Sequence, residues 1–364
     1  MSGIYIHIPF CKKRCAYCDF FSTTLLNQRE EYVKALLKEI VNRKDEANEP
    51  IRTIYIGGGT PSTLEPYDIS RIMATIDAPE AEEITMEVNP GDVTPAYLKA
   101  IKEAGINRLS IGIQSFQDPL LALIGRRHNA EQALTAVRNA KKAGFDNISI
   151  DLMYALPTQT MSQWEADIET AVNLEVQHIS SYGLIYEEGT ALTQRVRNGE
   201  LEMIDEDTEN AMYDRLCERL KKAGFVHYEV SNFAISGYES KHNSSYWNGT
   251  PYVGVGAGAH SYIGVERSWN PDDLNTYIRN INNGTLVRES ETLTDKDRYN
   301  EQIMLGLRTN HGIDEAITRQ IRGKYETILD FTQANLLTRT AQGRIVATQK
   351  GLHILNRIIE ELMI

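Results

Sequence analysis

The stretch Gly3-Ile-Tyr-Ile-His-Ile-Pro-Phe-Cys-Lys-Lys-Arg-Cys-Ala-Tyr-Cys18 joins a run of alternating apolar residues to three closely spaced cysteines. The apolar run predicts a β-strand over Gly3–Phe10. Directly after it come Cys11, Cys15 and Cys18. Three thiolates are one ligand short of closing a four-iron cluster or a tetrahedral metal site, so the remaining position can hold an exchangeable ligand. The stretch therefore predicts an open metal or iron–sulfur site at the end of the first strand.

The residues around the thiols favour the same interpretation. Lys12, Lys13 and Arg14 place positive charge among the cysteines, and we expect it to lower the pKa of the thiols and to compensate an anionic cluster. Two alternatives stay open, a zinc site completed by His7 and a chance grouping of cysteines. Chance is disfavoured because three of only four cysteines fall within this segment. The fourth, Cys217, lies at helical spacing among apolar residues and is expected in the core.

Composition limits the class of protein. The chain has 364 residues, of which 41% are hydrophobic and 24% charged, as in soluble globular proteins of two or three lobes. No apolar run approaches the roughly 18 residues needed to span a bilayer, and the N-terminus lacks a secretory pattern. We therefore expect a cytoplasmic protein with reduced thiols. The formal charge of −12 argues against a nucleic-acid partner.

Strand-like and helix-like segments alternate through the first half of the chain. The predicted strands are Gly3–Phe10, Thr53–Ile56, Glu83–Val88, Arg108–Gln114, Asn147–Tyr154 and His178–Leu184; the helices lie around 29–43, 66–76, 95–104, 130–143 and 162–174. Thr94 precedes Pro95 as a helix cap, and Ser162 with Glu165 forms a predicted capping box. Six strand–helix units predict an α/β fold with a parallel sheet, in the form of an open, partial (β/α)6 TIM-like barrel.

The pattern changes after about residue 200. A long amphipathic helix near 206–223 is followed by the glycine run Gly254–Gly258, which permits close approach to a ligand or to another strand. A hairpin over Leu337–Thr348 and a final helix from about Gly351 suggest a winged-helix shape. We expect a core domain over 1–230, a connecting region over 231–290 and a small C-terminal helical (winged-helix-like) domain over 291–364. Winged helices often bind DNA, but the acidic charge favours a packing role.

Polar residues follow the predicted strands at their carboxyl ends, where ligands gather in parallel sheets. Three glycines in Ile54-Tyr-Ile-Gly-Gly-Gly-Thr-Pro61 suit either a small molecule's amino or carboxylate end or a tight turn. Glu87 could accept from ribose hydroxyls or be a solvated edge residue. Gln114 and Asp151 lie in apolar strands, so each has an internal hydrogen bond or a ligand contact. Arg126 could neutralise a ligand carboxylate or be exposed.

A second group of residues lies in the connecting region. His242-Asn-Ser-Ser-Tyr-Trp247 brings an imidazole, a phenol and an indole into one short segment. Histidine and tyrosine both ligate haem iron, and an indole can stack on a macrocycle. The alternative is a structural aromatic turn.

Together these residues resemble the radical S-adenosylmethionine superfamily, in the branch of oxygen-independent coproporphyrinogen dehydrogenase and the HemW-type haem chaperones. The resemblance covers essentially the whole chain and is most specific in the context of the three cysteines and of Gly57-Gly-Gly-Thr-Pro61. It implies that Cys11, Cys15 and Cys18 bind a 4Fe-4S cluster whose fourth iron takes the amino and carboxylate groups of S-adenosylmethionine.

The resemblance also assigns roles to single residues. Tyr5, Gly58 and Glu87 match positions that contact the cluster-bound S-adenosylmethionine. A further set matches positions that hold a second molecule in the dehydrogenase: Tyr17, Gly59, Thr60, Gln114, Arg126 and Asp151. Whether a second molecule binds this chain stays open.

Two features divide the branch. The dehydrogenase carries a fourth cysteine two residues after the third, where this chain has Phe20; the chaperones carry His-Asn-x-x-Tyr-Trp, which begins here at His242. The resemblance therefore implies a haem chaperone that delivers haem to acceptor proteins and lacks coproporphyrinogen dehydrogenase activity. The alternative is that dehydrogenase. Peripheral membrane association and a homodimer are compatible with the resemblance, and the iron ligand within the motif stays open.

Overall fold

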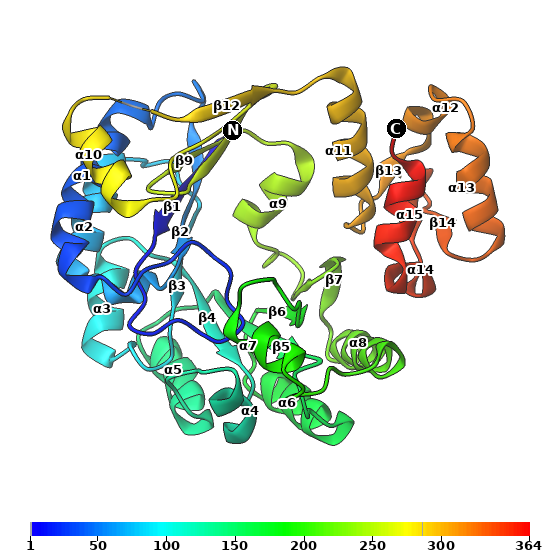
Figure 1. Cartoon of the computed structure of the whole chain (residues 1–364), viewed down its shortest axis with the longest axis horizontal. Helices are drawn as coiled ribbons and strands as arrows, with labels where there is room; N and C mark the ends of the chain where they lie inside the picture. The colour runs from blue at the N-terminus through cyan, green and yellow to red at the C-terminus, as the bar shows by residue number, and fades with distance from the viewer. Residues whose placement is uncertain (1, 286) are drawn as a thin grey trace.

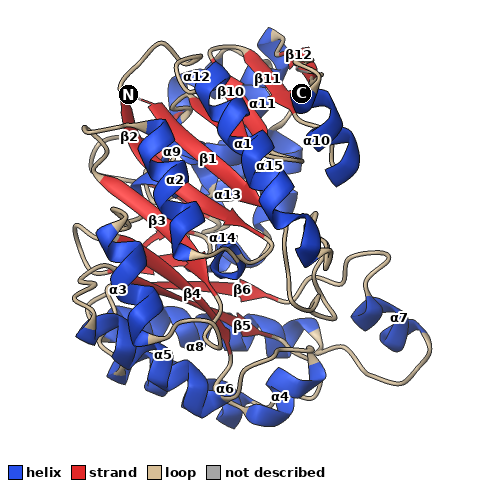
Figure 2. Ribbon diagram, turned by 90° about the vertical axis from the view of Figure 1, so that its left-hand side faces the viewer, coloured by secondary structure: helices blue, strands red, loops and turns tan. Residues whose placement is uncertain are grey.

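One large sheet forms the centre of the molecule (Figures 1 and 2). The computed structural model describes residues 2–285 and 287–364. Six strands lie side by side, parallel and in chain order: β1 (Ser2–Ile8), β2 (Ile51–Gly58), β3 (Glu83–Val88), β4 (Arg108–Gln114), β5 (Ile148–Tyr154) and β6 (His178–Gly183). The sheet is open, so the predicted partial barrel is confirmed.

The helices that connect these strands cover the outer face of the sheet (Figure 2). They are α1 (Arg29–Arg43), α2 (Pro66–Ile76), α3 (Pro95–Glu103), α5 (Ala130–Lys142) and α6 (Met161–Asn173), followed by α8 (Glu206–Lys222). The sequence did not predict α4 (Asp118–Leu123) or α7 (Ala191–Arg197), because helices of two turns or fewer show too little periodicity.

The helix caps were predicted with mixed success. Thr94 caps α3 as expected, since its side chain accepts from the backbone N–H of Tyr97. The capping box predicted at Ser162 and Glu165 is wrong. The N-cap of α6 is Thr160, which exchanges hydrogen bonds with Gln163. Two overlapping Ser/Thr-x-x-Glu/Gln patterns stand in this segment, and the earlier one begins the helix.

Strand β1 shows why the chain folds this way. Ile4, Ile6 and Ile8 fall on one face of the strand and are buried in the core that also contains helix α1. Tyr5 lies on the opposite face, in register with Tyr55 of β2. The inner face of the sheet therefore carries polar aromatic side chains, and the outer face carries aliphatic ones.

Later segments of the chain extend both edges of the sheet. Strand β9 (Tyr252–Val255) pairs in parallel with β1, and β10 (His260–Ile263), β11 (Glu266–Trp269) and β12 (Glu289–Thr292) follow antiparallel; β8 (Asn232–Ala234) and β7 (Val226–Glu229) lie beyond β6. A Cβ atom on Gly254 would lie 1.9 Å from the carbonyl oxygen of His260. The glycine run thus serves the approach of another strand. The domain boundaries at 230 and 290 stay predictions.

The C-terminal part has its own core. A small sheet in the order β13 (Ile313–Asp314), β15 (Arg344–Ala347), β14 (Leu337–Arg339) packs with α11 (Asp295–Leu307), α12 (Glu315–Arg319), α13 (Lys324–Gln333), α14 (Gln349–His353) and α15 (Leu355–Leu362). The predicted hairpin is confirmed. The single final helix is wrong, because the chain breaks at Ile354 into two helices. In the described ranges, no helix has both the length and the apolar character to cross a membrane.

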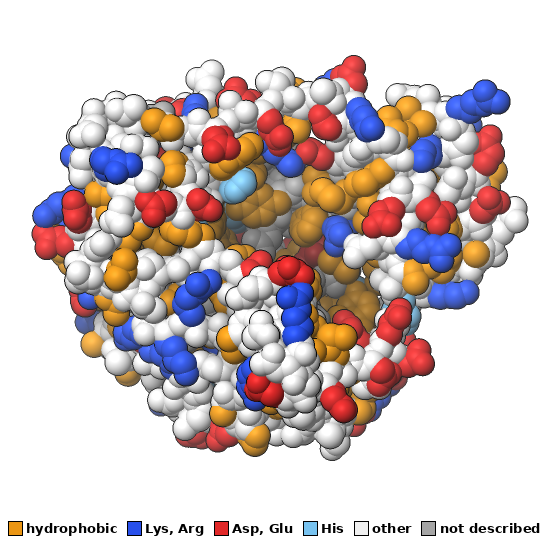
Figure 3. Space-filling model, in the orientation of Figure 1, with side chains coloured by type: hydrophobic (Ala, Val, Ile, Leu, Met, Phe, Trp, Pro, Cys, Tyr) orange, Lys and Arg blue, Asp and Glu red, His pale blue; other side chains and the backbone are white. Residues whose placement is uncertain are grey.

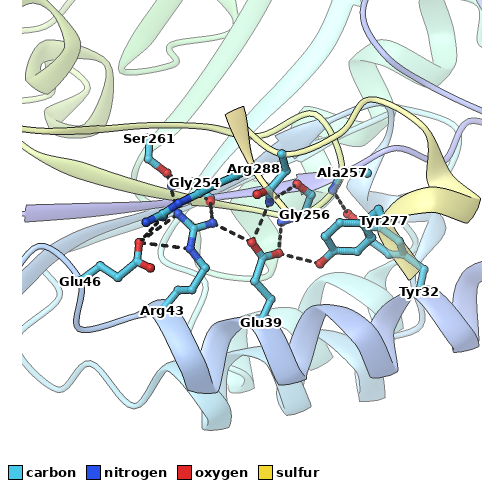
Figure 4. Close-up of polar contacts among 11 residues, drawn as sticks. Tyr32, Glu39, Arg43, Glu46, Gly254, Gly256, Ala257, Ser261, Tyr277 and Arg288 are labelled. Carbon is cyan, nitrogen blue, oxygen red and sulfur yellow. Dashed lines mark hydrogen bonds and ion pairs between the residues drawn. The ribbon is translucent and has the colours of Figure 1, made fainter. Parts of the chain in front are cut away.

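A buried ion pair ties helix α1 to the end of β9 (Figure 4). Glu39 and Arg43 are one helical turn apart, both are fully buried, and Nη1 of Arg43 lies 2.7 Å from Oε1 of Glu39. Arg43 also donates to the carbonyl oxygen of Gly254 at 2.7 Å. Glu39 accepts from the backbone N–H of Gly256 at 2.8 Å and from Tyr277 at 2.7 Å. Each charge therefore has a full set of partners, which a buried pair requires.

Removing the Glu39 carboxylate should destabilise the fold strongly. We expect Glu39→Ala to lower the free energy of unfolding by about 3–5 kcal/mol, because the buried Arg43 loses one of its two carboxylate partners and keeps only Glu46, while the N–H of Gly256 and the hydroxyl of Tyr277 lose their acceptor. Urea unfolding at constant pH measures this. The control is Glu30→Ala on the same helix, which breaks an exposed pair with Lys34 at the same spacing and should change little. Equal losses in the two variants would contradict the role of the buried pair.

Candidate functional site

A cavity of about 490 Å³ opens at the carboxyl ends of the parallel strands. It brings together most of the residues singled out from the sequence. Those on its lining are Cys11, Cys15, Tyr17, Cys18, Gly58, Gly59, Thr60, Glu87, Gln114, Arg126 and Asp151. Tyr5 and His242 do not line it. We call it the first cavity.

The loop after β1 carries the three cysteines to this cavity. The loop is closed on itself, since Thr23 donates its N–H to the carbonyl oxygen of Pro9 at 2.7 Å and Cys11 donates to that of Thr23 at 2.8 Å. Ala16 donates to the carbonyl oxygen of Ile124 at 2.9 Å, which ties the middle of the loop to the end of α4. Local backbone bonds thus hold the thiols on one wall.

Positive charge near the thiols comes from Arg14, as expected, and also from Arg126, which the sequence did not place there. Nη1 of Arg126 lies 3.4 Å from Sγ of Cys15. Lys12 pairs instead with Asp92 at 2.6 Å. Burial raises the pKa of the Cys18 thiol above its ordinary value; Arg14 does lower this pKa, as expected, but by less. A metal that binds Cys18 must therefore displace its proton.

The donor set fits an iron–sulfur cluster better than a single zinc ion. No three potential ligands in the described part of the chain converge on one point, as a mononuclear ion needs. His7, the proposed fourth zinc ligand, has both ring nitrogens occupied: Nδ1 lies 3.0 Å from the hydroxyl of Tyr5 and Nε2 3.0 Å from the carbonyl oxygen of Phe21. In a four-iron cluster each thiolate binds a different iron, so thiols spread along one wall suit it.

The glycines after β2 face the cysteine loop. A Cβ atom on Gly58, whose φ is +114°, would lie 2.7 Å from the ring of His7, and one on Gly59 would lie 2.9 Å from the carbonyl carbon of Pro9. Side chains are therefore excluded on both, and their backbone borders the first cavity. The close packing of the turn is confirmed, and the same absence of side chains leaves the backbone open to a small molecule, which stays a prediction.

Glu87, at the end of β3, has internal partners and is not a solvated edge residue. Its carboxylate accepts from the hydroxyl of Tyr55 at 2.8 Å and from the backbone N–H of Gly58 at 3.2 Å. Burial raises the pKa of Glu87 to about 7, and the nearby Asp151 adds to this. At neutral pH the side chain is therefore ready to accept from hydroxyl groups of a ligand or to be neutral without one.

A backbone irregularity aims Gln114 into the cavity. The pairing of β4 with β5 shifts register between Gly112 and Gln114, and Gln114 has a φ of +72°, which is strained for a residue with a side chain. The buried Asp167 holds the following loop by accepting from Ser115 at 2.6 Å. Such strain recurs at ligand sites because it directs a side chain where regular structure would not.

Two arginines border the cavity with unused hydrogen-bond donors. Nε of Arg108 and Nε of Arg126 are buried and lack a partner among the described residues. Buried donors of this kind call for an acceptor, and an anionic group of a ligand would supply one. Asp151 has an internal partner, accepting from Ser110 at 3.1 Å, and burial raises its pKa. The donor chemistry thus fits a small molecule with a carboxylate.

The sequence did not single out Arg108 or Tyr55, although both line the first cavity. Signals for both were present. Arg108 is a charged residue that begins a predicted apolar strand, and Tyr55 alternates with Ile54 and Ile56 as Tyr5 does with its own neighbours. A charged or phenolic side chain on the inner face of a sheet must be paired or face a cavity.

A second cavity of about 1030 Å³ lies beyond helix α9 (Lys241–Asn248). Figure 3 shows the surface hollowed between α9 and α11, with hydrophobic side chains around the hollow. Its lining includes Tyr246, Trp247, Tyr252, Tyr262 and Arg267. His242 is fully buried and lines neither cavity, whereas its neighbour Asn243 lines the first. The sequence did not foresee this second cavity, because it depends on the distant helix α11.

Known proteins resemble the chain over its whole length. The sequence model of the Radical SAM superfamily matches residues 5–171, and that of the HemN C-terminal domain matches residues 293–354. Curated relatives named Heme chaperone HemW are 37% identical in Lactococcus lactis, covering 100% of this chain and 97% of the relative, and 36% identical in Bacillus subtilis, covering 98% of each.

A solved structure shares the fold. Coproporphyrinogen III oxidase (HemN) from Escherichia coli, described as a radical SAM enzyme, superposes with a TM-score of 0.85 at 23% identity, covering 100% of this chain and 90% of that one. At this identity the likeness concerns the architecture alone.

The raised pKa of Glu87 should appear as a pH dependence of stability. The folded-state pKa of Glu87, about 7, lies above the ordinary value of 4.5. The protonated side chain therefore costs the fold nothing at low pH, and the free energy of unfolding falls as pH rises from about 5 to 8 and the buried carboxyl must ionise. Glu87→Gln has no group to ionise, so its free energy of unfolding should not fall in this way. The difference between the variant and wild type should therefore be larger at pH 8 than at pH 5 by on the order of 2–3 kcal/mol in favour of the variant. Urea unfolding of metal-free protein measures this. The exposed control Glu103→Gln should follow the wild-type profile, and a Glu87→Gln profile that did the same would contradict the burial argument.

Proposed function

The chain belongs to the radical SAM superfamily and, within it, to the HemW haem chaperone family, and from this premise we propose that it binds haem and transfers it to acceptor proteins. In this proposal the first cavity binds a 4Fe-4S cluster with S-adenosylmethionine, and the second cavity binds haem. The observation that carries the proposal is that α9, which bears the His242–Trp247 motif, lies between the two cavities.

The contents of the first cavity follow from its donors. Cys11, Cys15 and Cys18 would hold the cluster and leave one iron for the amino and carboxylate groups of S-adenosylmethionine. Glu87 would accept from the ribose hydroxyls, as strand-end carboxylates do in dinucleotide folds. The free Nε of Arg126 suits a carboxylate. The candidates for holding a second molecule are Tyr17, Gly59, Thr60, Gln114, Arg126 and Asp151.

The second cavity suits a flat, largely apolar ligand with an anionic edge. Tyr246, Trp247 and Tyr252 supply aromatic surface, on which a macrocycle can stack. Arg267 lies on the same lining and could pair with a propionate, although it now pairs with Glu301 at 2.8 Å. The volume of the second cavity is at the upper end of the range of small-molecule sites, about 300–1,000 Å³.

We expect no coproporphyrinogen turnover. Where the dehydrogenase has a fourth cysteine, this chain has Phe20, which is 66% exposed at the mouth of the first cavity. We place the protein in the cytoplasm, because assembly of the cluster requires reduced thiols. The acceptor proteins, peripheral membrane association and a homodimer belong to the same proposal.

The cluster assignment makes a direct prediction. After anaerobic reconstitution, wild type should contain iron and sulfide in the ratio of a 4Fe-4S cluster, and Cys11→Ser, Cys15→Ser or Cys18→Ser should each lose most of it, since thiolates are the required ligands. Cys217→Ser is the matched control, because Cys217 is a partly buried core residue of α8 and should keep the full content. A cluster that survives all three replacements would overturn the assignment.

Haem titration separates the chaperone from the dehydrogenase. We expect reconstituted wild type to bind haem and to leave coproporphyrinogen unchanged. Trp247→Ala should weaken haem binding by about 5–150-fold, because a stacked aromatic ring contributes roughly 1–3 kcal/mol. Trp164→Phe is the control, since Trp164 is buried in the main core away from both cavities. Conversion of coproporphyrinogen to protoporphyrinogen would show that the protein is the dehydrogenase and not a chaperone. Absence of haem binding would contradict the proposed function.

A further inference from the structure

Helix α9 is a shared wall between the two cavities. Asn243 lines the first cavity, and Ser244, Tyr246 and Trp247 line the second. His242, in the same helix, is fully buried and lines neither cavity. Its side chain packs between α9 and the sheet, against Thr53 and Tyr55 of β2.

Both ring nitrogens of His242 have partners. Nδ1 lies 2.8 Å from Oγ1 of Thr53, and Nε2 lies 2.9 Å from the hydroxyl of Tyr246. The imidazole packs against Gly3, on which a Cβ atom would lie 3.1 Å from its Cε1 atom. An imidazole binds iron through a free nitrogen lone pair, and this one has none to offer as placed.

A chain of contacts runs from one cavity to the other through this ring. Tyr55, on the first cavity, donates to Glu87 at 2.8 Å and stacks on His242 with 5.2 Å between ring centroids. On the other side, Tyr246 meets the ring of His242 edge-on at 5.2 Å and that of Tyr252 at 4.7 Å. Every link is a direct contact between neighbouring side chains.

Strand β3 supplies a second connection. Glu83 precedes Glu87 by four residues on the same strand, and its carboxylate accepts from the backbone N–H groups of Lys241 and His242, each at 2.9 Å. The carboxylate therefore fixes the first turn of α9. One strand thus carries a contact to the first cavity and the anchor of the helix that borders the second.

We propose that His242 is a positioning residue of this wall, and that a ligand bonded to Glu87 in the first cavity changes the affinity of the second cavity for haem through Tyr55 and His242. This inference rests on the proposed function. A ligand whose hydroxyls donate to Glu87 shares that carboxylate with Tyr55, and so alters the position of the Tyr55 ring against His242. His242 in turn sets the position of Tyr246 on the second cavity. By linkage the effect is reciprocal.

The test measures haem affinity with and without saturating S-adenosylmethionine on anaerobically reconstituted full-length protein. We expect the two dissociation constants to differ by at least about fivefold, and the affinity for S-adenosylmethionine to change by the same factor when haem is added. Equal haem affinities would overturn the inference and leave the proposed function standing. A wild type that binds no haem would instead remove the proposed function.

Tyr55→Phe tests the path. It keeps the ring that stacks on His242 and removes the hydroxyl that bonds to Glu87, so the coupling factor should fall to within about twofold of one while haem still binds. Tyr97→Phe is the matched control, since its hydroxyl bonds to the carbonyl oxygen of Leu64 and lines neither cavity. Coupling that survives in Tyr55→Phe, or is lost equally in the control, would overturn the path.

Imidazole rescue tests the role of His242. In His242→Ala we expect weaker haem binding but the wild-type ferric absorption and electron paramagnetic resonance spectra for the haem that does bind, because the iron ligand lies elsewhere. Added imidazole should then leave these spectra unchanged. A new spectrum in the variant that imidazole returns to the wild-type form would make His242 the iron ligand and overturn its positioning role.

Discussion

The parallel pairing of β1 with β2 on one side and β9 on the other is the constraint on which both cavities depend. It places Tyr5 in register with Tyr55 and brings the cysteine loop, which follows β1, beside the glycines that end β2. On the other side of β1, Tyr5 pairs with Gly254 of β9, and there the backbone of His260 in β10 leaves no room for a side chain. Parallel strands end at one edge of a sheet, so ligand-binding loops that are distant in the chain converge there.

Most buried polar groups in this molecule have hydrogen-bond partners, and the exceptions are informative. Glu39 and Arg43 are surrounded by partners and stabilise the junction of α1 with β9. Around the first cavity, by contrast, Arg108 and Arg126 keep a donor without a partner. A buried donor without an acceptor costs free energy, so its presence beside a cavity indicates where a ligand group belongs. The same contrast separates His242, which is fully partnered, from a residue poised to bind iron.

The expectations that depended on local pattern were the accurate ones. The six strands, most of the helices between them and the C-terminal hairpin follow from periodicity and turn residues. One error has a local cause, because the α6 cap lies at Thr160 where two capping patterns overlap. Another comes from tertiary structure, because burial of Cys18 raises its pKa by more than the flanking cations lower it. Charge along a sequence does not reveal which carboxylate, here Asp92, will take a lysine such as Lys12.

The sequence by itself determined the three-cysteine segment, the polar strand residues Glu87, Gln114 and Asp151, and the aromatic motif that begins at His242. Each is a property of a few consecutive residues, or of one strand and the turn after it. Tertiary structure alone decided that α9 stands between two cavities, that His242 faces the interior, and that Tyr55 links it to Glu87. These are contacts between segments far apart in the chain, and their geometry depends on how the whole sheet twists and packs, which no local pattern encodes.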